Sequence, residues 1–145
     1  MDPYAELKYS LYKNDIYKLD LKIKLNKLTT MNFASFIDDF TNILEEKKNK
    51  NLEKFIMVFD MNNIDYNINT SQVNEVTNLF KKYKNVFKEK LLGTFIIADN
   101  NVITIFINIF KNIYTPMKPL FLNTDIDNVI ENLVNNIDTN KEYKL

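Results

Sequence analysis

The sequence predicts an α/β fold with a mainly parallel sheet, an N-terminal antiparallel hairpin and about four helices. Three observations lead to this prediction: a strictly alternating segment at 17–25, short apolar runs at 55–59 and 94–98, and amphipathic segments between them. The predicted order is two strands, three helix and strand pairs, and a last helix. Strands that alternate with helices are typical of parallel sheets with right-handed crossovers.

The first two strands form the hairpin. In 17–25, Tyr, Leu and Ile alternate with Lys and Asp, so one face of this strand is expected to be wet. A weaker strand is predicted at 7–12. Between them, Lys13-Asn14-Asp15 has turn chemistry.

Thr29 or Thr30 is expected to cap the next helix, whose apolar residues run from Phe33 to Leu44. It ends in the lysines of 47–50, which suit a helix C-terminus. We interpret this run as a solvated terminus, with a ligand patch as the alternative. The continuous apolar run 55–59 then indicates a central parallel strand covered on both faces.

In the second half, 73–87 is predicted to be one amphipathic helix, and Gly93 to lead into a strand at 94–98. Residues 102–114 are interpreted as a helix because their polar residues form one narrow stripe. A short strand follows at 119–122, and Thr124 or Asp125 is expected to cap a helix at 126–137. One domain covers 1–145, with 138–145 as a frayed tail.

Composition excludes several classes of function. The charges of nineteen basic and nineteen acidic residues cancel, so the chain has no net electrostatic field that would attract nucleic acid. The chain has no His, Cys or Trp, which removes Ser-His-Asp and Cys-His nucleophiles and the usual zinc ligands. A single glycine rules out a Walker loop or a G-x-G-x-x-G turn. We therefore expect a protein that is not an enzyme and that has no metal or cofactor.

The location is predicted from what the chain lacks. Its first residues are polar, and 102–114 is too short and too often interrupted by polar residues to span a bilayer. We expect a cytoplasmic protein without a transmembrane segment. All basic residues are Lys, and Asn and Ile are abundant, as in AT-rich genomes, so a place in a virus particle is the alternative.

Polar residues follow the two apolar strand runs. Asp60 and Asp99 come directly after them, and Asn62, Asn63 and Asn100 extend the same group. The carboxyl ends of parallel strands meet at one edge, where open α/β folds place ligand sites. A partner-binding edge is therefore predicted. The alternative is that each Asp accepts hydrogen bonds from its own loop.

The element order and the stretch 55–64, Phe-Ile-Met-Val-Phe-Asp-Met-Asn-Asn-Ile, resemble STAS domains and anti-sigma-factor antagonists. The resemblance covers about 7–137 and implies a protein-interaction module whose partner docks around 62–71. The family's phosphorylation signature, Asp-Ser followed by glycine, is replaced by Asn-Ile-Asn-Thr-Ser-Gln at 67–72. Thr70 and Ser71 are thus the candidate phosphosites, and capping of the second helix is the alternative role.

Residues 83–91, 93–97 and 118–120 are also similar to the last half of a CRAL-TRIO lipid-binding domain. This likeness implies an alternative function, a small carrier of a hydrophobic ligand. Four large apolar residues lie on the flanking faces of the predicted helix at 102–114 and need cover from neighbouring helices, a second protein or such a ligand: Ile103, Ile105, Ile107 and Phe110. A protein contact, including self-association, is the interpretation we favour.

Overall fold

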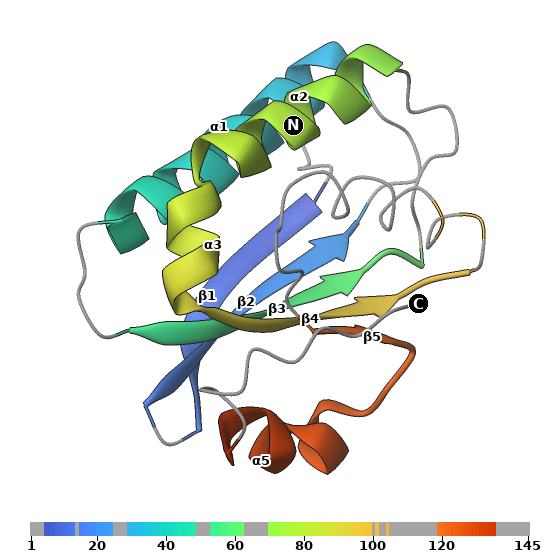
Figure 1. The fold of residues 1–145 in the computed structure, drawn as a ribbon. Coiled ribbons are helices and arrows are strands. Elements are labelled where there is room, and N and C mark those ends of the chain that lie inside the picture. The colour runs from blue at the N-terminus through green and yellow to red at the C-terminus, as the bar shows by residue number, and fades with distance from the viewer. Residues whose placement is uncertain are drawn as a thin grey trace.

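The computed structural model describes residues 5–13, 15–24, 29–48, 53–62, 70–99, 101, 104 and 119–135. Its centre is a five-stranded sheet in the order β1-β2-β3-β4-β5 (Figure 1). The strands are β1 (Ala5–Lys13), β2 (Ile16–Ile23), β3 (Lys54–Asp60), β4 (Leu91–Ile97) and β5 (Leu120–Leu122). The pair β1–β2 is antiparallel and the other neighbours are parallel. The predicted α/β class, with a mainly parallel sheet and an antiparallel hairpin, is confirmed.

The hairpin has the predicted turn. Asp15 follows β1 with a φ of 67°, in the left-handed region that Asp tolerates better than most residues. Tyr9 lies opposite Leu19, and the pairing shifts by one residue between Leu11 and Lys13. In β2, Leu19, Leu21 and Ile23 are buried and Lys22 is exposed, as the alternation predicts.

Helices cover both faces of the sheet. The helices α1 (Thr30–Lys48), α2 (Thr70–Lys82) and α3 (Lys84–Lys90) lie on one face, and α5 (Ile126–Asn135) lies on the other (Figure 1). Thr29 is the N-cap of α1: the Asn32 amide donates to Thr29 Oγ1 at 3.1 Å, and the Thr29 amide donates to Asn32 Oδ1 at 2.8 Å. Asp125 caps α5, since its carboxylate accepts from the Asp127 amide at 3.1 Å. No helix in these described ranges is long and apolar enough to cross a bilayer.

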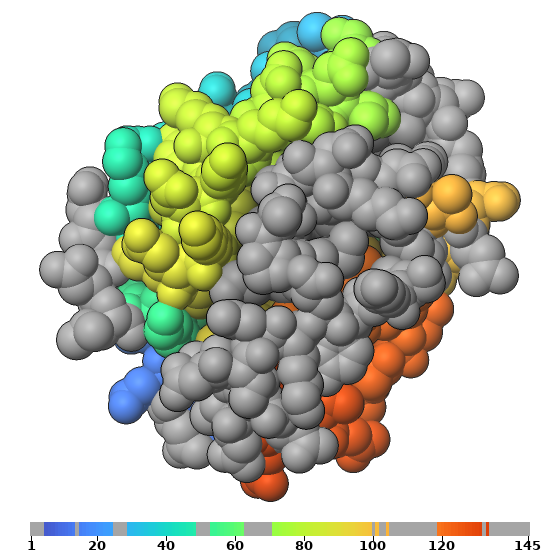
Figure 2. All heavy atoms as spheres, in the orientation of Figure 1, coloured from blue at the N-terminus to red at the C-terminus, as the bar shows by residue number. Residues whose placement is uncertain are grey.

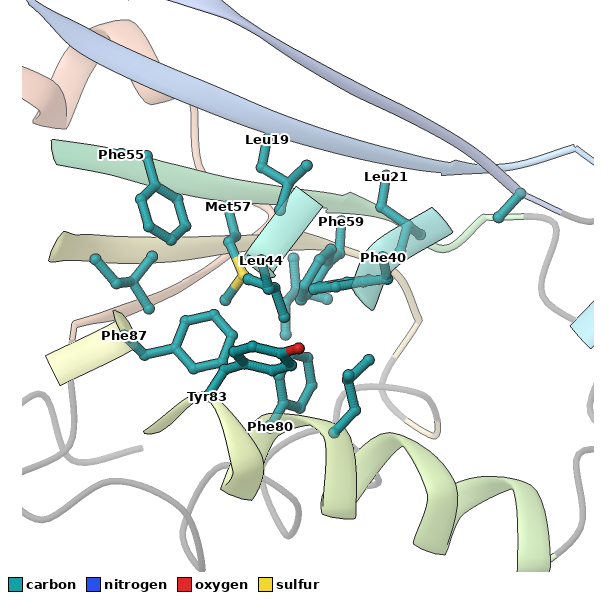
Figure 3. Close-up of a cluster of buried hydrophobic side chains, with 14 of the residues drawn as sticks. Leu19, Leu21, Phe40, Leu44, Phe55, Met57, Phe59, Phe80, Tyr83 and Phe87 are labelled. Atoms are coloured by element: carbon teal, nitrogen blue, oxygen red, sulfur yellow. The ribbon is translucent and has the colours of Figure 1, made fainter. Parts of the chain in front are cut away.

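The larger core lies between the sheet and the helices α1, α2 and α3. Phe55, Met57 and Phe59 of β3 point from the sheet towards Phe80 and Phe87 of the helices (Figure 3). Phe80 and Phe87 meet edge to face with ring centroids 5.3 Å apart. Burial of each such side chain contributes about 1.5–3 kcal/mol, so this layer carries much of the folding free energy.

The smaller core lies under α5. Ile56 and Val58 of β3 face Ile130 and Leu133 of α5, which confirms that β3 is covered on both faces. Gly93 lies inside β4, whereas the sequence placed it before the strand. A Cβ at Gly93 would come within 3.2 Å of Leu133 Cδ2 and of the Pro119 carbonyl oxygen. The glycine therefore allows α5 and the approach to β5 to pack closely on the sheet.

The single helix predicted at 73–87 is wrong: the structure has α2 and α3, with Tyr83 between them at φ −104° and ψ 23°. Two hydrogen bonds continue across the break, from the Tyr83 amide to the Leu79 carbonyl at 3.3 Å and from the Phe87 amide to the Tyr83 carbonyl at 3.2 Å. The apolar residues thus stay on the core side through the bend. The spacing of these apolar residues in the sequence does not reveal the bend at Tyr83.

Several predictions concern segments that the structure describes only in part or not at all. Asn101 and Thr104, two residues of the polar stripe predicted for the helix at 102–114, are helical and exposed. The rest of that helix, including Ile103, Ile105, Ile107 and Phe110, lies outside the described residues, as does the tail at 138–145.

Candidate functional site at the carboxyl edge of the sheet

The predicted site residues Asp60 and Asp99 follow neighbouring parallel strands. Asp60 lies opposite Ile97 in the β3–β4 ladder, and the Met61 amide donates to the Ile97 carbonyl at 2.8 Å, one step beyond β3. The polypeptide therefore leaves β3 and β4 at the same edge of the sheet. The helices α1 and α2 begin on this side of the sheet (right in Figure 1). The edge thus has the position predicted from the sequence.

Each of these two carboxylates is engaged by its own loop. Asp60 Oδ1 accepts from the Asn62 amide at 3.2 Å, and Asp99 Oδ1 accepts from the Asn101 amide at 3.1 Å. These are Asx turns, the local role named above as the alternative. Each hydrogen bond fixes the turn that directly follows its strand, while Asp99 stays exposed and Asp60 half-buried.

The third strand of the edge adds Asn123, which was not among the residues predicted from the sequence. Its side-chain nitrogen donates to the Ala98 carbonyl at 3.0 Å, and its side-chain oxygen accepts from the Ala98 amide at 3.1 Å. The Asn123 amide also donates to the Ile96 carbonyl at 2.8 Å, and φ at Asn123 is 49°. An Asn directly after a strand run was the available signal, because Asn tolerates positive φ and pairs readily with backbone groups.

The remaining predicted residues divide between described and undescribed parts. Asn62 is exposed after β3, and Ser71 is exposed in the first turn of α2. Thr70 is the first residue of α2, while Asn63 and Asn100 lie outside the described residues. The residues just after β4 stand out at the surface (orange, right in Figure 2). We use the name polar edge for the polar positions that follow the parallel strands or begin α2 on this side of the sheet: Asp60, Asn62, Ser71, Asp99 and Asn123.

The chemistry of the polar edge is that of hydrogen bonding. Its side chains are carboxylates, amides and a hydroxyl, which can donate to or accept from a partner's backbone and side chains. No group of three or more acidic side chains suited to a metal ion occurs among the described residues. Two turns with exposed polar groups, at Asn62 and Asp99, are suited to recognition of a surface.

At the opposite edge, the sequence interpretation of Lys47 as part of a solvated terminus is wrong. Its side chain is only 5% exposed, and its ammonium lies 3.1 Å from Glu53 Oε2 and 3.7 Å above the centre of the Tyr9 ring. The Tyr9 hydroxyl donates to the same Glu53 oxygen at 3.1 Å, and the Lys90 ammonium donates to the Lys47 carbonyl. Lys48 is exposed, and the rest of the run, 49–50, lies outside the described residues.

This cluster, Lys47 with Glu53 and Tyr9, is built to hold elements together. Burial, and then the Glu53 carboxylate, raises the pKa of the Tyr9 phenol, so the phenol stays a donor. The Lys47 ammonium already pairs with the Glu53 carboxylate and with the face of the Tyr9 ring. The cluster joins the C-terminus of α1 to the hairpin and the start of β3.

Two further tyrosine–carboxylate pairs connect the layers. The Tyr83 hydroxyl donates to Glu45 of α1, and the Tyr12 hydroxyl donates to Asp127 of α5. Burial, with help from these carboxylate partners, raises the pKa of Tyr83 and of Tyr12 to about 12. The hydrogen bond from Tyr83 lowers the pKa of Glu45. The first pair joins the bend between α2 and α3 to α1, and the second pair joins β1 to α5.

Comparison of the chain with protein-family models, curated proteins and solved structures finds no match. The resemblances to STAS and CRAL-TRIO domains therefore stay predictions from the order of elements and the quoted residues. The polar edge must be judged on its own geometry.

Proposed function

We propose that this chain is a non-enzymatic protein-interaction module of STAS-like type, and that its partner binds the polar edge. The observation that carries the proposal is the pair of Asx turns at Asp60 and Asp99, which follow adjacent strands and leave the sheet at the same edge. A preformed surface loses little conformational entropy on binding, which favours recognition.

The chemistry of the edge supports binding over catalysis. The carboxylates of Asp60 and Asp99 already accept backbone hydrogen bonds, and the chain has no His or Cys to act as base or nucleophile. Amide and hydroxyl side chains such as Asn62 and Ser71 provide donors and acceptors of modest strength. Such groups orient a partner and give specificity.

Ser71 gives the proposed module a point of regulation. It is exposed in the first turn of α2, where the positive end of the helix dipole stabilises added negative charge. A phosphate on Ser71, or on Thr70 beside it, would place about two negative charges against the docking partner. Phosphate mapping on the protein from its native cells tests this role, and the absence of phosphate from both residues under all growth conditions would contradict it.

The docking proposal is tested with a surface variant and a matched control. The double variant Asn62→Lys/Ser71→Lys changes two exposed positions at the polar edge. The control Asn42→Lys/Asn85→Lys makes the same kind of change at exposed positions on α1 and α3. Partners captured from native cells with the wild-type chain would be purified, and their Kd measured for all three proteins.

We expect the edge variant to weaken binding of the partner by about tenfold or more, equivalent to about 1.4 kcal/mol. The control should bind like the wild type. A partner with the same Kd for the edge variant and the wild type would contradict docking at this edge. Turnover of a substrate that is lost in Asp60→Asn or Asp99→Asn would contradict the non-enzymatic proposal.

The alternative function, transport of a hydrophobic ligand, depends on Ile103, Ile105, Ile107 and Phe110. These residues lie outside the described part of the chain, so no contact described above favours that function over protein binding. The same holds for a structural role in a virus particle.

A further inference from the structure

The outer border of the sheet is formed by β1, the longest described strand with nine residues. It pairs with β2 on one side and, within the described residues, with no strand on the other. An edge strand presents a row of backbone N–H and C=O groups that suit pairing with another strand. Leu11 on this strand is 61% exposed.

We infer that two copies of this chain associate through β1, antiparallel about a twofold axis at Tyr9, so that the two sheets become continuous. A twofold axis makes the contact self-complementary, because each residue faces the same set on the other copy. Centred on Tyr9, the pairing uses the regular part of β1, from Leu7 to Leu11, before the register of β1 with β2 shifts. Leu7 of each copy then lies opposite Leu11 of the second copy, which covers the exposed leucine.

The side chains of β1 favour this centre over one at Lys8. A centre at Lys8 would place two lysines directly opposite each other, which is destabilising. With the axis at Tyr9, Lys8 faces Ser10 and Leu7 faces Leu11, so no like charges are directly opposed. The charge of Lys8 thus disfavours the register centred on that residue, and the cover of Leu11 by Leu7 favours the register centred on Tyr9.

The size of the contact predicts a weak dimer. One strand pair buries less surface than the roughly 1,200–2,000 Å² of a stable interface, so the copies should separate on dilution. The β1 border and the polar edge involve different residues, so a variant that tests one surface leaves the residues of the other unchanged.

Sedimentation equilibrium of the full chain over a wide concentration series tests the inference. The wild-type mass should rise from the 17.2 kDa of one chain towards twice that value. Leu11→Lys should weaken association by about tenfold, since both symmetric Leu7–Leu11 pairs across the contact are lost. The matched control is Met31→Lys on α1, where Met31 is 68% exposed, and it should associate like the wild type.

A wild-type chain that stays monomeric at the highest concentration overturns the inference, as does equal association of Leu11→Lys and the wild type. Equal weakening in Met31→Lys also overturns it, because the contact would then lie elsewhere.

The register is tested separately with cysteines, since the natural chain has none. Lys8→Cys and Ser10→Cys chains, mixed in equal amounts and gently oxidised, should form the mixed disulfide in clear excess over both homodisulfides. A statistical mixture, in which half of the product is mixed, would overturn the axis at Tyr9.

Discussion

The side chain of Asn123 pairs with both backbone polar groups of Ala98, and so continues the β4–β5 ladder past the end of β5. The Asn123 amide reaches the Ile96 carbonyl at 2.8 Å as well. Ala98 is buried, so its amide and carbonyl need partners inside the protein. One residue thus satisfies three backbone groups at the point where the polar edge begins.

Replacement of Asn123 by glycine should lower the free energy of unfolding by about 2 kcal/mol, because the backbone groups of Ala98 lose their partner. Asn123→Ala should cost about 1 kcal/mol more, since alanine disfavours the φ of 49° at this position. Urea unfolding of the three proteins measures both differences. A glycine variant as stable as the wild type would show that water replaces the side chain at no cost.

Lys47→Met should be among the most destabilising single changes at a charged position. It leaves the Glu53 carboxylate, which is 18% exposed, without its cation, and we expect a loss of about 3 kcal/mol. Lys48→Met is the matched control, since the Lys48 side chain is 60% exposed and its ion pair with Glu45 spans 3.7 Å. Its cost should stay below about 1 kcal/mol.

The double variant Lys47→Met/Glu53→Gln separates the ion pair from simple packing. It should be less destabilised than the sum of the two single variants, because neither charge is then left unpaired. Chemical denaturation at neutral pH gives the four free energies that this cycle requires. Strict additivity would mean that the two groups do not interact.

The sequence predicted those features that depend on neighbours along the chain. The alternation in 17–25 indicated the wet and buried faces of β2, and Asp125 was one of two candidates for the cap of α5. Ile130 and Leu133 lie on the predicted apolar face of α5 and are buried under the sheet. In each case the local period or cap chemistry agrees with the tertiary structure.

What the sequence did not predict depends on contacts between distant segments. Lys47 is buried because Glu53 and Tyr9, from a loop and from β1, surround its ammonium. Tyr83 fits the regular apolar pattern and yet interrupts the helix, while its ring enters the core and its hydroxyl donates to Glu45. No periodicity in the chain encodes either relationship. At the candidate site, the two strand-end Asp residues were found, whereas the pairing of Asn123 with Ala98 required the register of β4 and β5.

Lys22→Ile tests the orientation of the hairpin. Lys22 is exposed on the sheet face that points away from α1, so the change should alter stability by less than about 0.5 kcal/mol. It should promote aggregation, because it adds an apolar side chain to a wet sheet surface near an edge. Light scattering during storage and urea unfolding provide the two readouts, with Lys84→Ile on α3 as an exposed helical control. A loss of several kcal/mol would contradict the exposed orientation.

The contact between Tyr83 and Glu45 should make stability depend on pH at both extremes. The pKa of Glu45 is lowered from 4.5, mainly by the hydrogen bond from Tyr83, so its contribution is present above about pH 4.5 and is lost as pH falls through the folded-state pKa. The pKa of Tyr83 is raised from 10.0 to about 12 by burial and then by Glu45. Its contribution is therefore present below about pH 10 and is lost as pH rises through about 12.

Tyr83→Phe removes the hydroxyl and keeps the ring, so it isolates this contact from core packing. The difference in free energy of unfolding between wild type and Tyr83→Phe should be constant from about pH 5 to 10 and should narrow on either side. Glu45→Gln keeps an acceptor but removes the charge, and should abolish the narrowing on the acid side only. Unfolding curves at a series of pH values, with the ultraviolet absorbance of phenolate to follow tyrosine ionisation, measure both effects. If the wild type and Tyr83→Phe differ by the same amount at every pH, the hydroxyl does not interact with an ionised Glu45, and the bend at Tyr83 is held by its ring alone.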